Sequence, residues 1–154
     1  MIWVTLLIMH GLLAVALLGA LTHQAVSVVW VGARRRSFVE RFAAVASPNY
    51  VTAIIVLFLI TFLFGAYVYA SYRTDVRPVF EDLRWYKSIG LFELKEHFIS
   101  LALGLLPTYW FIWKYLPLSQ QASVRRIMTL TIAAVVWYGF LVGHILNDFR
   151  GLGT

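Results

Sequence analysis

Four long apolar runs dominate the chain and leave few alternatives for its fold. They cover residues 2–32, 51–72, 91–115 and 127–147 of a 154-residue sequence. A helix of about 20 apolar residues crosses the hydrocarbon core of a bilayer. Each backbone polar group there must find its hydrogen bond inside the protein, which favours helices. The sequence predicts an all-α polytopic membrane protein, a four-transmembrane-helix up-down bundle forming a single domain over residues 1–154.

Composition excludes several classes of protein. The chain is 61% hydrophobic and only 13% charged, which is outside the range of soluble domains. It has no cysteine, which removes disulfides, thiolate metal sites and covalently attached haem. No Ser–His–acid or HExxH arrangement is present, so we predict no catalytic residues. The net charge of +6 lies mostly in short connections, which indicates a membrane surface rather than nucleic acid.

The connections predict how the chain lies in the membrane. Residues 78–87 read as a short amphipathic helix in the interface, with Pro78 at its first turn. The connections after the first and third runs carry seven of the thirteen basic residues, including the triplet Arg34, Arg35 and Arg36. Basic residues favour the cytoplasmic side. We therefore expect an inner-membrane protein of bacterial type with both termini on the outer, periplasmic side.

Three histidines occupy the apolar runs of three different predicted helices. If the chain weaves back and forth, His10, His97 and His144 all lie about 9–11 Å from the midplane on the same, outer side. An ionisable ring in hydrocarbon costs free energy unless it is paired or ligated. This shared depth predicts a functional site in one leaflet.

Haem b is the cofactor that these residues favour. A helical bundle holds it with one imidazole from each of two helices, and here His97 would pair with His10 or His144. Gly104 and Gly143 would leave room for the macrocycle. The Gly139–Gly143 pattern is equally typical of close helix packing, and we favour that interpretation of it.

Glu93 stands one helical turn before His97. Its carboxylate is predicted either to orient the His97 ring or to join it as a metal ligand. Three imidazoles and one carboxylate would also suit copper or non-haem iron. The plainer interpretation is an acidic group stabilised by the beginning of a helix.

His23 and Gln24 form a second polar group on the first run. His23 is 13 residues from His10, about 20 Å along a helix, so the two rings cannot share a metal. With Ser27, one turn away, they form a polar stripe. We expect it to hydrogen-bond to another helix, a quinone or a partner subunit.

The four spans and the histidines His10, His97 and His144 together resemble the class of four-helix membrane cytochrome b subunits. The resemblance covers the architecture of the whole chain but includes no specific sequence motif. It implies haem b and electron transfer between quinone and a partner protein. The chain departs from two-haem members of that class because it has no histidine pair in the inner leaflet.

Three functions remain open at this point. The first is a non-catalytic, haem-binding electron-transfer subunit of an oxidoreductase complex. The second is a copper-handling or metal-centre assembly protein. The third is an accessory subunit without a cofactor, whose histidines satisfy buried polar partners. In each case we expect other membrane subunits, lipid and in the first case quinone as partners, and no nucleic acid.

Overall fold

The computed structural model describes residues 2–29, 38 and 46–151. Its helices are α1 (Ile2–Val29), the 3-10 turn η1 (Ser47–Tyr50), α3 (Val51–Ser71), the π-helical turn η2 (Tyr72–Val76), α4 (Arg77–Asp82), α5 (Tyr86–Lys114) and α6 (Ala122–Gly151). The described part of the chain contains no strand. The prediction of an all-α protein is confirmed.

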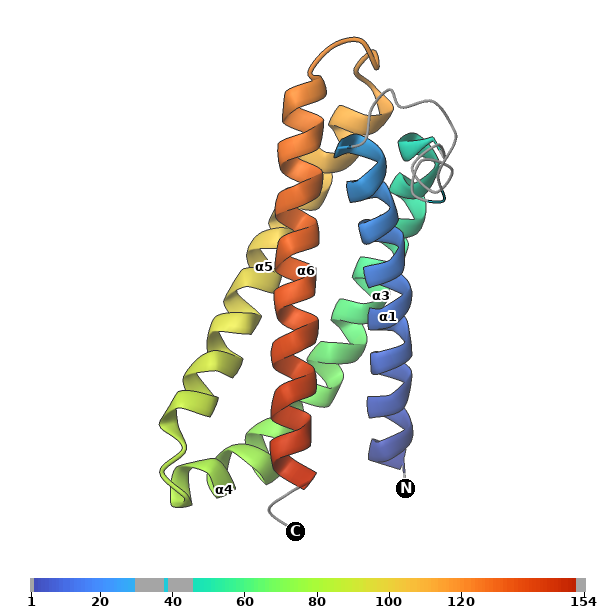
Figure 1. Ribbon diagram of the computed structural model, residues 1–154. Helices are drawn as coiled ribbons and strands as arrows, with labels where there is room; N and C mark the ends of the chain where they lie inside the picture. The colour runs from blue at the N-terminus through green and yellow to red at the C-terminus, as the bar shows by residue number, and fades with distance from the viewer. Residues whose placement is uncertain (1, 30–37, 39–45, 152–154) are drawn as a thin grey trace.

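The four long helices alternate in direction (Figure 1). α1 begins and α6 ends at the same end of the molecule, here called the termini end. The connection from α5 to α6 and the beginning of α3 lie at the opposite end, here called the loop end. α1 packs against α3 and α6, and α5 packs against α6, whereas α3 and α5 have the least mutual contact of the neighbouring long helices. The bundle is therefore open between α3 and α5.

Three helical segments are long and apolar enough to cross a membrane among the described residues. They are Ile2–Val29, Ser47–Asp82 and Ala122–Asn147. The four-span count predicted from sequence is not established, because α5 is not among them although it has 29 residues. The first half of α5 carries Glu93, Lys95 and Glu96, which lower its hydropathy. The structure supports a helical membrane protein with three candidate spans.

The segment before α5 differs from the predicted interfacial helix 78–87. α3 continues through η2 into α4, which ends at Asp82. Arg84 has φ of 56°, a left-handed conformation that stops a helix. The Trp85 amide then donates to the Phe80 carbonyl at 2.8 Å, and their rings lie 5.6 Å apart. This closed turn explains why α5 begins at Tyr86 and not near residue 91.

The other predicted boundaries shift by smaller amounts. α1 is described to Val29, so the end of the predicted run at 32 and the arginine triplet lie outside the described residues. α5 ends at Lys114, one residue before the predicted end. α6 begins at Ala122 and ends at Gly151, beyond the predicted 127–147 on both sides. Polar residues continue a helix past its apolar part, which hydropathy does not detect.

The hydrophobic core occupies the half of the bundle toward the loop end. All four long helices contribute, and its members are Leu17, Leu18, Leu21, Val51, Ile54, Phe58, Ala102, Leu106, Tyr109, Trp113, Ile132, Ala133 and Val136. Gly139 marks the close crossing of α5 and α6, because a Cβ there would lie 2.8 Å from Ile99 Cδ1. Packing of apolar side chains thus organises the loop-end half.

Arg125 closes the end of α5. Its side chain is 3% exposed and donates to backbone carbonyls of the α5 end and the following turn, those of Ile112, Leu116, Pro117, Leu118 and Gln120. Its guanidinium also lies 5.6 Å from the centre of the Trp113 ring. The last carbonyls of a helix have no partner within it, and a cation there is favourable. Arg125 therefore fixes the turn between α5 and α6.

Replacing Arg125 should destabilise the bundle strongly. Arg125→Ala leaves several buried carbonyls without a donor, which we expect to lower the free energy of unfolding by about 3 kcal/mol. The matched control is Arg126→Ala, an exposed neighbour with one hydrogen bond to the Val28 carbonyl. It should cost less than about 1 kcal/mol. Thermal or denaturant unfolding in micelles measures both, and equal losses would contradict this role of Arg125.

Candidate functional site

The three predicted ligand histidines lie on α1, α5 and α6 with different surroundings. His10 packs against Gly65 of α3. His97 is exposed, on the same face of α5 as the exposed Leu94 and Leu101. His144 is exposed and stacks on Phe140 of its own helix at 6.1 Å. Within the part of the chain that is described, no group of three or more histidines, cysteines or carboxylates could hold a metal ion. The predicted set with Glu93 is not assembled here.

His10 lies at a close approach of α1 and α3. A Cβ on Gly65 would lie 3.0 Å from His10 Cε1, so the ring occupies the space that a side chain would need. The Nδ1 atom is buried without a hydrogen-bond partner. His10 is half-buried, at the contact between α1 and α3.

Lys95 is a residue that the sequence reasoning did not single out. Its side chain is only 14% exposed, and the ammonium lies 2.9 Å from a Glu96 carboxylate oxygen. The ammonium also lies 4.0 Å from the centre of the Phe92 ring, and the side chain passes close to Gly139 of α6. Lys95 is therefore a largely buried lysine with a paired ammonium, held between α5 and α6. In the sequence, Lys95 stands four residues before Ile99, so both side chains lie on one face of a helix. That is the face of α5 that packs against Gly139 of α6.

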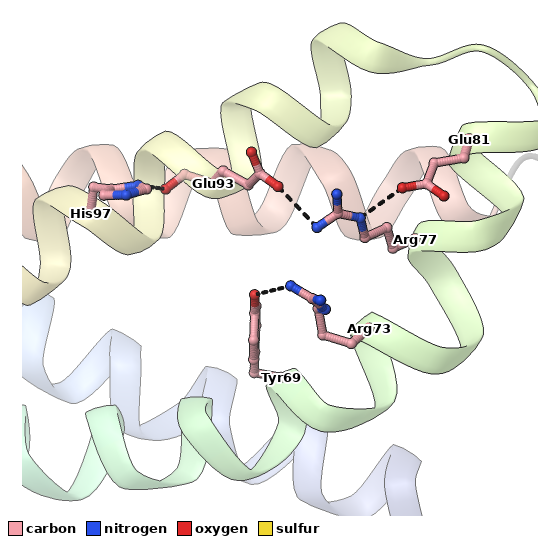
Figure 2. A network of polar contacts seen from close by, with 6 residues as sticks. All are labelled: Tyr69, Arg73, Arg77, Glu81, Glu93 and His97. Atoms are coloured by element: carbon pink, nitrogen blue, oxygen red, sulfur yellow. Dashed lines mark hydrogen bonds and ion pairs between the residues drawn. The ribbon is translucent and has the colours of Figure 1, made fainter.

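His97 is oriented by Glu93, although not by the predicted atom. Nδ1 of His97 lies 2.6 Å from the Glu93 backbone carbonyl, and the carboxylate of Glu93 instead accepts from Arg77 at 3.0 Å (Figure 2). A carbonyl oxygen only accepts hydrogen bonds, so Nδ1 carries the proton. In the neutral ring this leaves the lone pair on Nε2. That tautomer is the usual one for a histidine that ligates a metal through Nε2.

Arg77 joins α4 to α5 at the termini end. Its Nε donates to the Glu81 carboxylate at 2.8 Å, and its Nη1 donates to the Glu93 carboxylate (Figure 2). Arg73, one turn earlier, lies 3.4 Å from the Tyr69 hydroxyl and over the Tyr69 ring. Arg77 is thus neutralised by two carboxylates, and Arg73 is the exposed cation of this group, near the face of α5 that bears His97. Exposed pairs contribute little to stability, so their main effect is on position and local potential.

An aromatic contact supports the same corner of the molecule. The rings of Tyr72 and Phe92 stack with their centres 3.8 Å apart. The Tyr69 ring lies farther away, with its centre 5.9 Å from that of Tyr72 and 6.0 Å from that of Phe92. Tyr72 belongs to η2 and Phe92 to α5. The stack therefore holds the beginning of α5 against the end of α3, next to the Arg77–Glu93 ion pair.

The predicted clearance glycines differ from Gly139. No atom lies within 4 Å of a Cβ built on Gly104 or on Gly143. Only Gly139, the first member of the Gly139–Gly143 pattern, is required for close packing of α5 and α6. The space beside Gly104 and Gly143 is open, and they lie on different helices.

The polar stripe on α1 joins helices at the loop end. Gln24 is fully buried, its Oε1 accepts from the Tyr109 hydroxyl at 2.5 Å, and its Nε2 donates to the Ser47 carbonyl at 3.0 Å. The Ser27 hydroxyl bonds the Gln24 carbonyl and the Ser47 hydroxyl. His23 stacks on Tyr50 at 4.8 Å. Gln24 thereby connects α1, η1 and α5 with both ends of its amide used.

Comparison with known proteins gave no relatives. No protein-family model matches the chain, and neither the curated proteins nor the solved structures searched gave a significant match.

The contact between His10 and Gly65 makes a specific prediction. Gly65→Ala should destabilise the protein by about 1 kcal/mol or more, because the ring must move and the close packing is lost. Gly11→Ala is the control, since nothing lies near its Cβ and alanine favours a helix. The double variant His10→Ala with Gly65→Ala should recover most of the loss. Unfolding in micelles tests this cycle, and additive losses would contradict the contact.

Proposed function

We propose that this protein is a haem b-binding subunit of a membrane redox complex, and that it carries electrons between quinone and a partner protein. The observation that supports this is the His97 ring, which is exposed on α5 and has its Nδ1 committed to the Glu93 carbonyl. Its Nε2 is the atom that a haem iron would take. The protein itself acts as an electron carrier, not as a catalyst.

His97 is the residue of this chain that would hold the haem. His10 is packed against Gly65 and His144 stacks on Phe140 of α6, whereas His97 shares an exposed face with Leu94 and Leu101. A further imidazole would come from a partner subunit that covers this face of α5. When bound, haem b supplies one-electron transfer. The exposed Arg73 of η2 would offset the charge of the propionates.

The surroundings of His97 support a covered face. A histidine exposed to hydrocarbon costs free energy unless it is paired or ligated. The adjoining Leu94 and Leu101 are 45% and 65% exposed, so the same face has apolar surface for a partner to bury. A partner with its own histidine would satisfy both requirements at once.

In this proposal α5 is the fourth span. It is about 43 Å long by helix geometry, which is enough to cross a bilayer. Its charges lower the mean hydropathy, but Glu93 is paired with Arg77 and Lys95 with Glu96. Lys114, Arg125 and Arg126 belong to the loop end, which supports a cytoplasmic position for that end. Both termini would then be on the periplasmic side of a bacterial inner membrane.

A second candidate is an accessory subunit without a cofactor. The observation in its favour is that, among the described residues, the metal-ligating side chains do not gather into one group. His10 then satisfies a packing need beside Gly65, and the outward face of α5 serves only to bind a partner.

Labelling of single cysteines tests whether α5 crosses the membrane. The natural chain has no cysteine, so each single substitution creates a unique thiol. Asp75→Cys lies before α5 and Ser119→Cys lies after it. We expect an impermeant maleimide to label Asp75→Cys in intact spheroplasts and Ser119→Cys only after permeabilisation. Labelling of both from one side would exclude a spanning α5.

Spectra of the complex isolated from native membranes test the haem. A low-spin b-type difference spectrum is expected, and His97→Ala should reduce it at least tenfold by removing an axial ligand. His23→Ala is the control and should leave the spectrum unchanged. Full haem content in His97→Ala would refute the assignment. Copper without haem would favour a copper-handling protein, and neither metal nor haem would favour the accessory subunit.

A further inference from the structure

An apolar groove separates α3 from α5 toward the loop end. It encloses about 480 Å³, and its walls include Ile55, Val56 and Leu59 of α3 and Leu103, Pro107 and Trp110 of α5. Val56, Leu59 and Trp110 are 47%, 43% and 42% exposed, so the groove is open on its outer side. Its volume is in the range of sites that hold a small molecule or a ligand chain.

The groove follows from how the two helices pack. α3 and α5 are the adjacent long helices with the least mutual contact, whereas each packs closely on one other neighbour. Leu106 belongs both to the core and to the wall of the groove, so the floor of the groove is the core itself. A rigid floor with open sides describes a binding groove better than a gap that side chains would fill.

The depth and lining of the groove specify the chemistry of its occupant. Its α3 wall belongs to the candidate span Ser47–Asp82, so the groove opens toward the hydrocarbon of a bilayer. An apolar site offers no partners to water. The Thr52 hydroxyl and the Trp110 ring nitrogen are the polar side-chain groups of the wall, and both belong to the loop-end part of it. An alkyl chain therefore suits the groove, with its polar end at the loop end.

Positive charge lies at that same end. Lys114 is exposed in the last turn of α5, one turn beyond Trp110. A cation at this end of the groove complements an anionic headgroup at the membrane surface.

We infer that the groove binds one acyl chain of an anionic phospholipid, with the phosphate at Lys114. The chain lies along Leu103, Pro107 and Trp110 and covers the side of the bundle that α3 and α5 leave open. This inference concerns a different face from the outward face of α5 that bears His97, and it does not depend on haem.

Lipid binding to the purified full chain tests the proposal. Native mass spectrometry after gentle extraction, with phosphatidylglycerol added back in known amounts, should show one tightly bound lipid per chain. Leu59→Trp fills the groove and should weaken binding at least tenfold. Lys114→Gln should weaken it about fivefold, the effect of one basic residue at a membrane surface. Leu63→Trp is the matched control, because Leu63 is 65% exposed and is not part of the wall.

The outcomes separate the occupants. Unchanged phosphatidylglycerol binding in Leu59→Trp would overturn the proposal, and so would retention of a neutral isoprenoid lipid in place of phospholipid. Equal weakening by Leu63→Trp would also overturn it, because the loss would then not be specific to the groove. Circular dichroism and thermal unfolding establish that each variant is folded. If Leu59→Trp does not fold, Val56→Phe makes the same test at a neighbouring wall position.

Discussion

The burial of Arg125 is the interaction on which the arrangement of the bundle depends. Its guanidinium donates to backbone carbonyls between Ile112 and Gln120. The same side chain therefore caps the end of α5 and fixes the turn into α6. Gln24 plays the corresponding part for α1, through its bonds to Tyr109 and Ser47. Both groups lie at the loop end, next to the apolar core. In hydrocarbon an unsatisfied polar group is costly, so these contacts hold four helices in one arrangement.

This concentration of packing at the loop end leaves the termini end free for other contacts. There the helices are joined by ion pairs and aromatic stacking, such as Arg77 with Glu93 and Tyr72 with Phe92. The Arg77–Glu93 pair is partly exposed, so it contributes little to stability and mainly fixes the position of α4 beside α5. The oriented ring of His97 and the paired Lys95 both lie in this half. The proposed haem and partner contacts therefore occupy the part of the molecule that contributes least to its core.

The sequence predicted only some of the contacts at the candidate site. The adjacency of Glu93 and His97 follows from the spacing of four residues on a helix, and the structure does place them in contact. Spacing does not reveal that the backbone carbonyl, and not the carboxylate, meets the ring. Arg77 takes the carboxylate because the turn at Arg84 folds α4 back beside α5. The helical rise per residue likewise predicted that the three histidines lie at one depth in the membrane. It does not predict the direction in which each side chain leaves its helix.

The sequence by itself determined the helical class, because apolar runs in a bilayer must satisfy their own backbone hydrogen bonds. The lengths of the apolar runs also predicted the four long helices seen among the described residues, and their alternating direction was predicted on the assumption that each run crosses the membrane. Only the tertiary structure decided which faces meet. His10 lies inside against Gly65, His97 lies outside, and Arg125 is a buried cap although it reads as a loop charge. The physical reason is that α3 and α5 do not close on each other, and rotation of a helix about its axis depends on its neighbours.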